Sequence, residues 1–418
     1  MTTLFRSKGA PAVRIRTRLR LGTKVAVVLG VLAVGGVLPV SSAGASSDHE
    51  GASVRSIGTL LATLHGPAAN PYGPFGTTVA LSGDTAIVGF PGSPYERAAA
   101  YIYSKSHGLW SLVSTLHRSG GSFGGQVAIS GTTVGVAGGI GGASDVFVFS
   151  KDKSGWPTTP TATLSDPGMR NGFGSSLAIS GTTIVVGSAA TDSSTGGAYV
   201  YQDTGGVWPT TPSATLTEPS QNVSGIDESV VSMWGTTIVV GTSSDEGTSA
   251  VYMYDEGSTG WPTSPTTTLE DPSGPGDGFG GSVAISGSTL VVGAPFADSA
   301  EGASFIYAKG SDGWPLVPTT VLANPSPSTH LFGASVSLSG STVIISPWGG
   351  GNSPGAAYMY SMARATWPVA PTVALSDPST RVDDYFGDEV AVSGATAIVG
   401  APGLRSAEIP AAAYVFHA

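Results

Sequence analysis

The chain has 418 residues, of which 11% are charged, with a formal net charge of −10 and no cysteine. An average globular protein is about 25% charged, so uncharged residues must cover much of this surface. The absence of cysteine excludes disulfides and thiolate chemistry. The excess of acid disfavours binding to nucleic acid and to anionic membranes, because like charges repel.

The first 45 residues differ from the rest and predict a secretory signal peptide. They hold seven of the 18 basic residues and none of the 28 acidic ones. An apolar run follows from Val25 to Val40, and small residues stand at Ala43 and Ala45. A basic segment, an apolar segment and an A-x-A site are the parts of a cleavable signal. We therefore expect cleavage after Ala45 and export by the general secretory route.

An uncleaved membrane anchor is the alternative interpretation of this apolar run. The run has about 16 residues and contains three glycines, which is short for a helix that crosses a bilayer. We therefore favour cleavage, with residues 46–56 as a short tether. No second apolar segment occurs, so we expect no membrane insertion after cleavage. The long basic segment indicates a bacterial source.

Seven copies of one sequence pattern fill residues 57–418. Clear copies read FGGSVAISGSTLVVG from Phe279 and FGDEVAVSGATAIVG from Phe386, and a degenerate copy at Asp227 has Asp-Glu in place of Phe-Gly. The copies begin at positions 75, 123, 173, 227, 279, 332 and 386, so the repeat length is 48 to 54 residues. Repeats of about this length that contain several short strands are typical of β-propeller blades.

Each copy predicts four short strands. Ser-Gly-x-Thr joins an alternating first strand to an apolar second strand in a tight hairpin. The third strand has two aromatic residues at period two, such as Tyr252 and Tyr254, and the fourth ends in a leucine, such as Leu269. The seventh copy lacks its fourth strand, and a matching strand with Leu64 precedes the first copy. We therefore predict an all-β, seven-bladed β-propeller with four-stranded blades, closed by the N-terminal strand.

The recurring Phe-Gly and the Val-Gly-Ala-Pro at 292–295 and 399–402 resemble the FG-GAP repeat of integrin α-subunit propellers. A bacterial branch with the pattern FG-x-S-V-A-I-S-G-x-T is the closer match. The resemblance covers about residues 57–418. It implies an extracellular, ligand-binding, seven-bladed propeller, with cell adhesion as the expected role.

The chain departs from this family at the connection between the first two strands. Integrin-type repeats often carry a D-x-D-x-D-G calcium loop there, whereas this chain has SGDT, SGTT, WGTT, SGST or SGAT, and only Asp84 supplies a carboxylate. Calcium takes six to eight oxygen ligands, several of them from carboxylates. The family's calcium sites therefore do not carry over, and we predict no metal ion and no other cofactor.

Tryptophan recurs at one place in six of the seven repeats, in three of them as Gly-Trp-Pro before the fourth strand. A ring of aromatic platforms for sugars is one interpretation. A packing residue that fixes the hairpin is the other, and equal use across the repeats favours it. Trp234 and Trp348 break the pattern, and Trp348, in the glycine-rich loop 347–355, is a candidate ligand contact. The six recurring residues are Trp110, Trp156, Trp208, Trp261, Trp314 and Trp367.

Acidic residues gather on one predicted face. In a four-stranded blade the loops after strands two and four lie on one side of the ring, and 20 of the 28 acidic residues fall in or beside them. Two clusters there are candidates for a cationic partner, for weak binding of divalent ions or for a glycosidase carboxylate pair, although neither includes a histidine. Simple solvation is the alternative. The clusters are Glu270, Asp271 and Asp277, and Asp383, Asp384, Asp388 and Glu389.

We expect a binding module rather than an enzyme. Export, regular repeats and one acidic, loop-rich face favour a secreted or cell-surface monomer that recognises an extracellular protein or glycan. The six histidines show no metal-ligand spacing, and no G-x-S-x-G elbow or phosphate loop occurs. An extracellular propeller enzyme that acts on polysaccharide, as a hydrolase or lyase, is the alternative. The candidate contacts are Asp271, Asp277, Trp348, Asp383 and Asp384.

Overall fold

The computed structural model describes most of the predicted propeller. The predicted signal peptide and most of the predicted tether lie outside the described residues. The described ranges are 55–67, 73–92, 97–118, 121–140, 143–168, 172–189, 197–217, 226–244, 249–326, 329–348, 355–381, 383–403 and 411–418.

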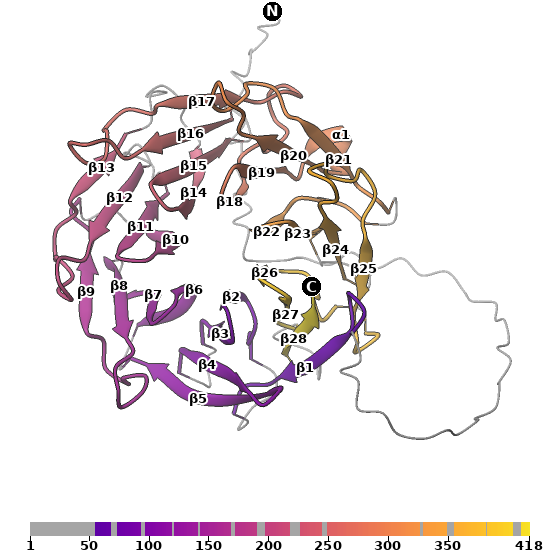
Figure 1. Ribbon diagram of the computed structural model, residues 1–418. Helices are drawn as coiled ribbons and strands as arrows, with labels where there is room; N and C mark the ends of the chain where they lie inside the picture. The colour runs from indigo at the N-terminus through magenta and orange to yellow at the C-terminus, as the bar shows by residue number, and fades with distance from the viewer. Residues whose placement is uncertain are drawn as a thin grey trace, which may run out of the picture. The chain divides into compact units, whose positions relative to one another are not determined.

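Seven four-stranded antiparallel sheets follow one another as blades (Figure 1). Blade 1 has β2 (Thr78–Ser82), β3 (Thr85–Phe90), β4 (Ala99–Ser106) and β5 (Leu109–His117). Blade 2 has β6 (Ser122–Ser130), β7 (Thr133–Ile140), β8 (Ala143–Ser150) and β9 (Ala162–Ser165). Blade 3 has β10 (Phe173–Ser180), β11 (Thr183–Ser188), β12 (Gly197–Gln202) and β13 (Ala214–Leu216).

The remaining four blades repeat this order. Blade 4 has β14 (Ile226–Trp234), β15 (Thr237–Ser244), β16 (Ala250–Asp255) and β17 (Thr267–Glu270). Blade 5 has β18 (Ser282–Ser286), β19 (Thr289–Ala294), β20 (Ala303–Ala308) and β21 (Thr320–Ala323). Blade 6 has β22 (Ser335–Ser339), β23 (Thr342–Ser346), β24 (Ala356–Ser361) and β25 (Val373–Ser376). Blade 7 has β26 (Val390–Ser393), β27 (Thr396–Ala401), β28 (Ala412–His417) and β1 (Leu60–Leu64).

Helix is almost absent from the described residues. The short α1 (Ala297–Ala300) joins β19 to β20, and its inner residues Asp298 and Ser299 have left-handed backbone angles. An α-helix of L-residues excludes such angles, so this segment is a tight turn in the loop after the second strand.

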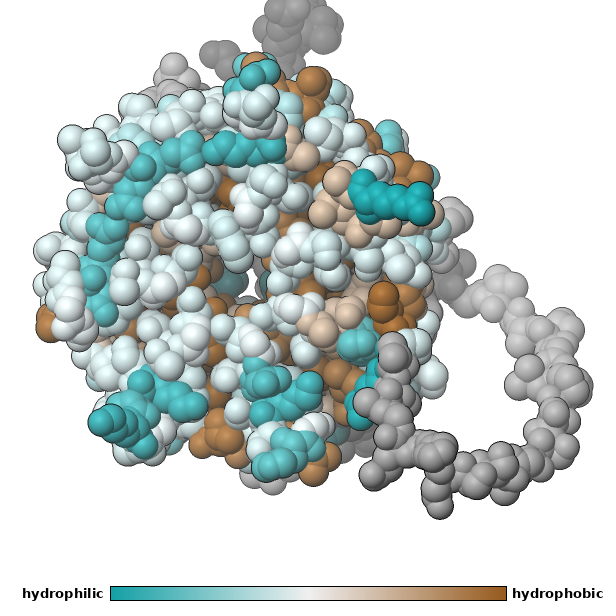
Figure 2. All heavy atoms as spheres, viewed as in Figure 1, coloured by the Kyte–Doolittle hydropathy of each residue, from teal (hydrophilic) through white to brown (hydrophobic). Residues whose placement is uncertain are grey.

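The blades close into a ring because the first strand of the chain belongs to the last sheet. β1 pairs antiparallel with β28, with Leu64 opposite Ala413. The innermost strands contact one another in the order β2, β6, β10, β14, β18, β22, β26 and then β2 again. The middle of this ring is open in the space-filling view (Figure 2). The predicted seven-bladed β-propeller is therefore confirmed.

Removal of residues 46–66 is expected to unfold or aggregate the protein. The deletion leaves β28 as an unpaired sheet edge and takes Leu64 out of the core between blades 7 and 1. Size-exclusion chromatography and thermal melting measure the effect. Removal of residues 46–54 alone keeps β1 and serves as the control. A monomeric 67–418 chain that melts with the control would show that β1 is not needed for closure.

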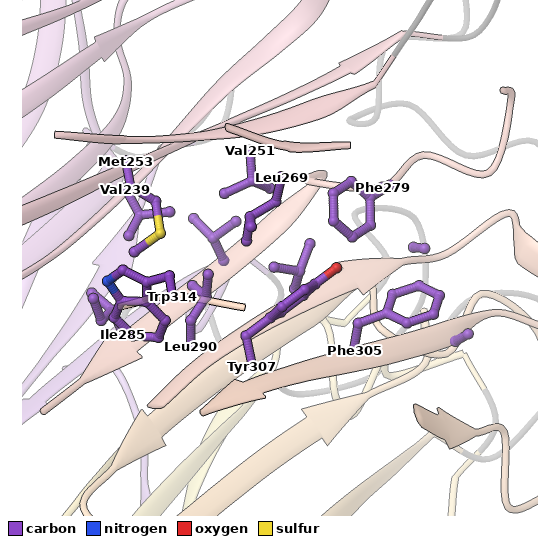
Figure 3. Packing of buried hydrophobic residues seen from close by; sticks show 14 of the residues in the cluster. Val239, Val251, Met253, Leu269, Phe279, Ile285, Leu290, Phe305, Tyr307 and Trp314 are labelled. Carbon is purple, nitrogen blue, oxygen red and sulfur yellow. The ribbon is translucent and has the colours of Figure 1, made fainter. Parts of the chain in front are cut away.

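The hydrophobic core is divided into seven parts, each between two adjacent blades. The part between blades 4 and 5 is shown in Figure 3, where Met253 and Leu269 of one blade face Phe305 and Tyr307 of the next. Ile306 lies between the last two residues in sequence but packs against blade 6. Side chains alternate between the two faces of a strand, so each apolar strand is buried on both sides.

Paired glycines let the backbones of adjacent blades touch. A Cβ on Gly293, in β19, would lie 2.1 Å from the carbonyl oxygen of Gly333 in blade 6. Gly333 has a φ of 93°, which strongly favours glycine. The same approach joins Gly241 to Gly280 and Gly400 to Gly76. The glycine of Val-Gly in one blade thus meets the glycine of Phe-Gly in the next.

Substitution of Gly293 by alanine is expected to destabilise the fold by about 2 kcal/mol or more, because the added methyl group overlaps a backbone oxygen. Gly310→Ala is the matched control, since a Cβ there meets nothing within 4 Å. Urea unfolding of both variants measures the difference. Equal stability of the two would mean that the blades separate easily at this contact.

The Ser-Gly hairpins also join neighbouring blades. In five of the seven junctions, the glycine N–H donates to the serine hydroxyl of the preceding blade, at 2.9 to 3.2 Å. We call these bonds the serine ring. In blade 4 the serine position holds Trp234, whose side chain is 53% exposed. An indole has no acceptor for the N–H of Gly287 in the next blade, so the serine ring is interrupted here.

Candidate binding face

The blade topology defines two faces. The loops after second and fourth strands form one, which we call the acidic face, and its described parts include 271–281, 295–302 and 383–389. The hairpins after first and third strands form the other, the turn face. Figure 2 shows pale residues, neither strongly polar nor apolar, over most of the side in view. By sequence position, 20 of the 28 acidic residues fall in or beside the loops of the acidic face.

The loop between blades 4 and 5 brings two predicted contacts close together. The Asp271 Oδ1 accepts hydrogen bonds from the N–H groups of Ser273, at 2.9 Å, and Gly274, at 3.3 Å. Its Oδ2 is buried without a hydrogen-bond partner. Burial, and secondarily the charge of Asp277, raises the pKa of Asp271. Asp271 therefore shapes the loop, while Asp277 remains partly exposed.

The loop between blades 6 and 7 holds a buried pair of carboxyl groups. Asp377 is 6% exposed and Asp384 is 1% exposed. The Ser379 hydroxyl lies between them, 2.6 Å from Asp377 Oδ2 and 2.7 Å from Asp384 Oδ2. Asp384 Oδ1 accepts the N–H of Phe386 at 3.1 Å. These contacts hold together the two ends of the loop that leads into blade 7.

The predicted contacts in this region differ in exposure. Asp384 is buried, so its carboxyl group faces the loop interior instead of a partner. The neighbouring Asp383 is partly exposed on the acidic face, and so is Trp348, two residues after β23. Residues 349–354, which continue the loop after Trp348, lie outside the described residues. Asp383 and Trp348 are thus accessible candidates, and Asp384 is a structural residue.

The sequence interpretation missed Asp377 and Ser379. Both belong to an Asp-Pro-Ser that follows the fourth strand, and the same three residues occur at 271–273. Between blades 5 and 6 the corresponding triplet is Asn324-Pro325-Ser326. This recurrence is the signal that could have identified Asp377 as part of the loop framework.

The recurring tryptophans pack inside the molecule. Trp314 and Trp367 are 9% and 5% exposed and belong to the cores that precede their blades. Trp156 and Trp261 are partly buried against equivalent cores. Lys309 lies 5.5 Å from the centre of the Trp314 ring, and Lys151 lies 5.7 Å from that of Trp156. The packing interpretation is therefore the better one for these residues.

Metal binding has little support in the described part of the chain. No group of three or more His, Cys, Asp or Glu side chains there is arranged to hold a metal ion. Within the same residues no helix has the length and apolarity of a membrane span. The hairpins after the first strands contain only one carboxylate, Asp84, and Lys105 lies 3.9 Å from it.

Calcium is expected to leave the stability of residues 46–418 unchanged, because these hairpins lack the carboxylates of a calcium loop. Melting curves with calcium, with magnesium and with a chelator test this. A fall of more than about 5 °C in chelator, about 4 kcal/mol for a domain of this size, would contradict the prediction. Recovery with calcium but not magnesium would then indicate a selective site.

The fold defines the class of this protein as a seven-bladed β-propeller. A sequence model of the FG-GAP repeat matches residues 156–201, 271–307 and 373–416. Each match covers the first three strands of one blade, in blades 3, 5 and 7. The propeller therefore contains FG-GAP repeats, as the resemblance implied. No curated protein matches the chain.

Proposed function

We propose that this protein is a secreted or cell-surface binding module that contacts an extracellular protein or glycan through its acidic face. We also infer that it represents a bacterial branch of FG-GAP propellers without calcium loops. The propeller fold with its FG-GAP repeats supports a binding role. The observation that carries the choice of face is the concentration of 20 of the 28 acidic residues in its loops.

The loops support this choice because they vary while the hairpins do not. The loops at 271–278 and 377–385 both lead from the fourth strand of one blade to the first strand of the next. They differ in length and in the partners of their carboxylates. The Ser-Gly hairpins repeat one bond in five junctions. Variable loops on a repeated scaffold are the usual place for a binding surface.

We infer binding instead of catalysis from the roles of the carboxyl groups in these loops. Asp271 accepts backbone N–H groups, and Asp377 and Asp384 share a serine. These bonds fix loop conformation. A glycosidase needs two carboxyl groups that flank an open substrate site, and the interior position of Asp384 does not meet that need.

The first experiment is to find a ligand. Residues 46–418 are applied to arrays of glycans and of extracellular proteins, and each ligand found is tested at several salt concentrations. We expect association with a cationic ligand to slow as salt rises, because screening weakens attraction to the acidic face.

Neutralising the partly exposed acids is expected to weaken binding to that ligand about tenfold. The variant set is Asp271→Asn, Asp277→Asn and Asp383→Asn, measured by surface plasmon resonance. The control set, Lys105→Ala, Lys151→Ala and Lys309→Ala, changes charge on the turn face. Unchanged affinity in the acidic set with loss in the control set would place the site on the turn face. Each set is first checked for an unchanged melting temperature.

A further inference from the structure

Asp377, Ser379 and Asp384 form a bridge between blades 6 and 7. Its hydrogen bonds need one proton more than a serine hydroxyl and two ionised carboxyl groups contain. Ser379 Oγ is within 2.7 Å of an oxygen from each of Asp377 and Asp384. A hydroxyl group carries one proton and can donate it once. The N–H of Arg381 also donates to Ser379 Oγ, at 3.1 Å. The second short contact to a carboxyl oxygen therefore requires a proton on that carboxyl group.

The hydrogen bonds identify where this proton lies. The N–H groups of Ser379 and Arg381 donate to the two oxygens of Asp377, at 2.7 and 3.0 Å, so both oxygens already accept hydrogen bonds. Asp384 Oδ1 accepts the N–H of Phe386, so the proton is on Oδ2. Asp384 then donates to Ser379, and Ser379 donates to Asp377. We call this arrangement the carboxyl–serine bridge.

Other titratable groups lie near the bridge. Asp383, Tyr385, Asp388 and Arg381 belong to the same loop and the start of blade 7. Tyr414 of β28 packs against the bridge, and burial with the charges of Asp377 and Asp384 raises the pKa of Tyr414 to about 12. Tyr414 is therefore neutral throughout the range in which carboxyl groups titrate.

A neutral version of the same bridge joins blades 5 and 6. The Thr329 hydroxyl donates to Asn324 Oδ1 at 3.1 Å, and Asn324 Nδ2 donates to the carbonyl oxygen of Thr329 at 2.7 Å. This loop ties its ends without an ionisable side chain. The carboxyl–serine bridge performs the same task with two acids, so its hydrogen bonds depend on pH, whereas those between Asn324 and Thr329 do not.

We propose that the carboxyl–serine bridge is a proton-dependent fastener, which holds residues 377–381 and 383–386 closed while one proton is shared and releases them when that proton passes to solvent. Release leaves two carboxylates beside one hydroxyl, and their repulsion favours opening. Thr380, Asp383 and Tyr385 have φ angles of 55°, 70° and 62°, and such angles are unfavourable for side chains other than glycine. Opening of the loop allows these three residues to adopt more favourable backbone angles.

The direction of the pH effect follows from Asp384. Burial, and then the charge of Asp377, raises the pKa of Asp384 to about 6. In the open loop its pKa returns to about 3.9. The closed form is thus fully favoured below about pH 4, and this advantage is lost as pH rises through about 6. Because the loop carries Asp383, the effect reaches the acidic face, and its influence on binding rests on the proposed function.

Hydrogen exchange of residues 46–418, followed by mass spectrometry at about pH 4.5 and about pH 8, tests the proposal without a ligand. After correction for the intrinsic pH dependence of exchange, protection of the peptide spanning 377–386 should fall at least about tenfold at the higher pH. The peptide with Asn324 and Thr329 should keep its protection. Equal corrected protection at both pH values, or the same fall in both peptides, would overturn the proposal.

Two variants test whether the pH dependence of protection comes from the carboxyl–serine bridge. Asp384→Asn cannot ionise and is expected to remove the pH dependence in the 377–386 peptide. Asp383→Asn is the matched control, since it alters a neighbouring acid outside the bridge and asparagine tolerates the left-handed φ; it should retain the pH dependence. Persistence of the pH effect in Asp384→Asn contradicts the proposal, and the wild-type measurement decides the question if that variant does not fold.

Discussion

Close contact between backbones of adjacent blades is the constraint on which the rest of the fold depends. Where a Cβ would lie 2.1 Å from a neighbouring carbonyl oxygen, as at Gly293 and Gly400, only glycine fits. That approach sets the spacing between sheets, and the spacing decides which side chains fill the space. Phe279, Phe305 and Tyr307 fit between blades 4 and 5 at this distance. The Phe-Gly and Val-Gly motifs therefore recur in the sequence because the same backbone contact recurs between adjacent blades around the ring.

Much of this fold could be predicted because its signals are local and repeated. Two aromatics at period two, as at Phe305 and Tyr307, indicate a strand with one aromatic face, and Leu64 before the first repeat indicates where the ring closes. The serine ring could not be predicted, since it joins residues such as Ser82 and Gly131 that are 49 positions apart. In the sequence, each of these residues is already explained by the tight hairpin to which it belongs, so nothing there indicates a bond between blades.

The candidate site was harder to predict because acidity does not specify exposure. Asp383 and Asp384 are adjacent in sequence, yet one is partly exposed and the other is 1% exposed. Backbone angles at Asp383 and Tyr385 turn Asp384 inward, toward Asp377 seven positions earlier. Charge counting points to particular loops, while the contacts within each loop depend on turns that composition does not encode. The Asp-Pro-Ser triplet was the local signal available.

Trp234 has a mechanical consequence for the molecule. A closed ring distributes load over all its junctions, and the serine ring fastens the hairpins on both sides of blades 1, 2, 6 and 7 but not those beside blade 4. The inner strand of blade 4 is joined to its neighbours by other serines, Ser176 and Ser232. Deformation imposed by heat, by pulling or by a bulky guest in the central opening will concentrate where the ring is least fastened. The hairpin contact between Trp234 and blade 5 is thus the one we expect to separate first, whereas β1 and β28 remain paired along most of their length, with one irregularity between Leu60 and Ala62.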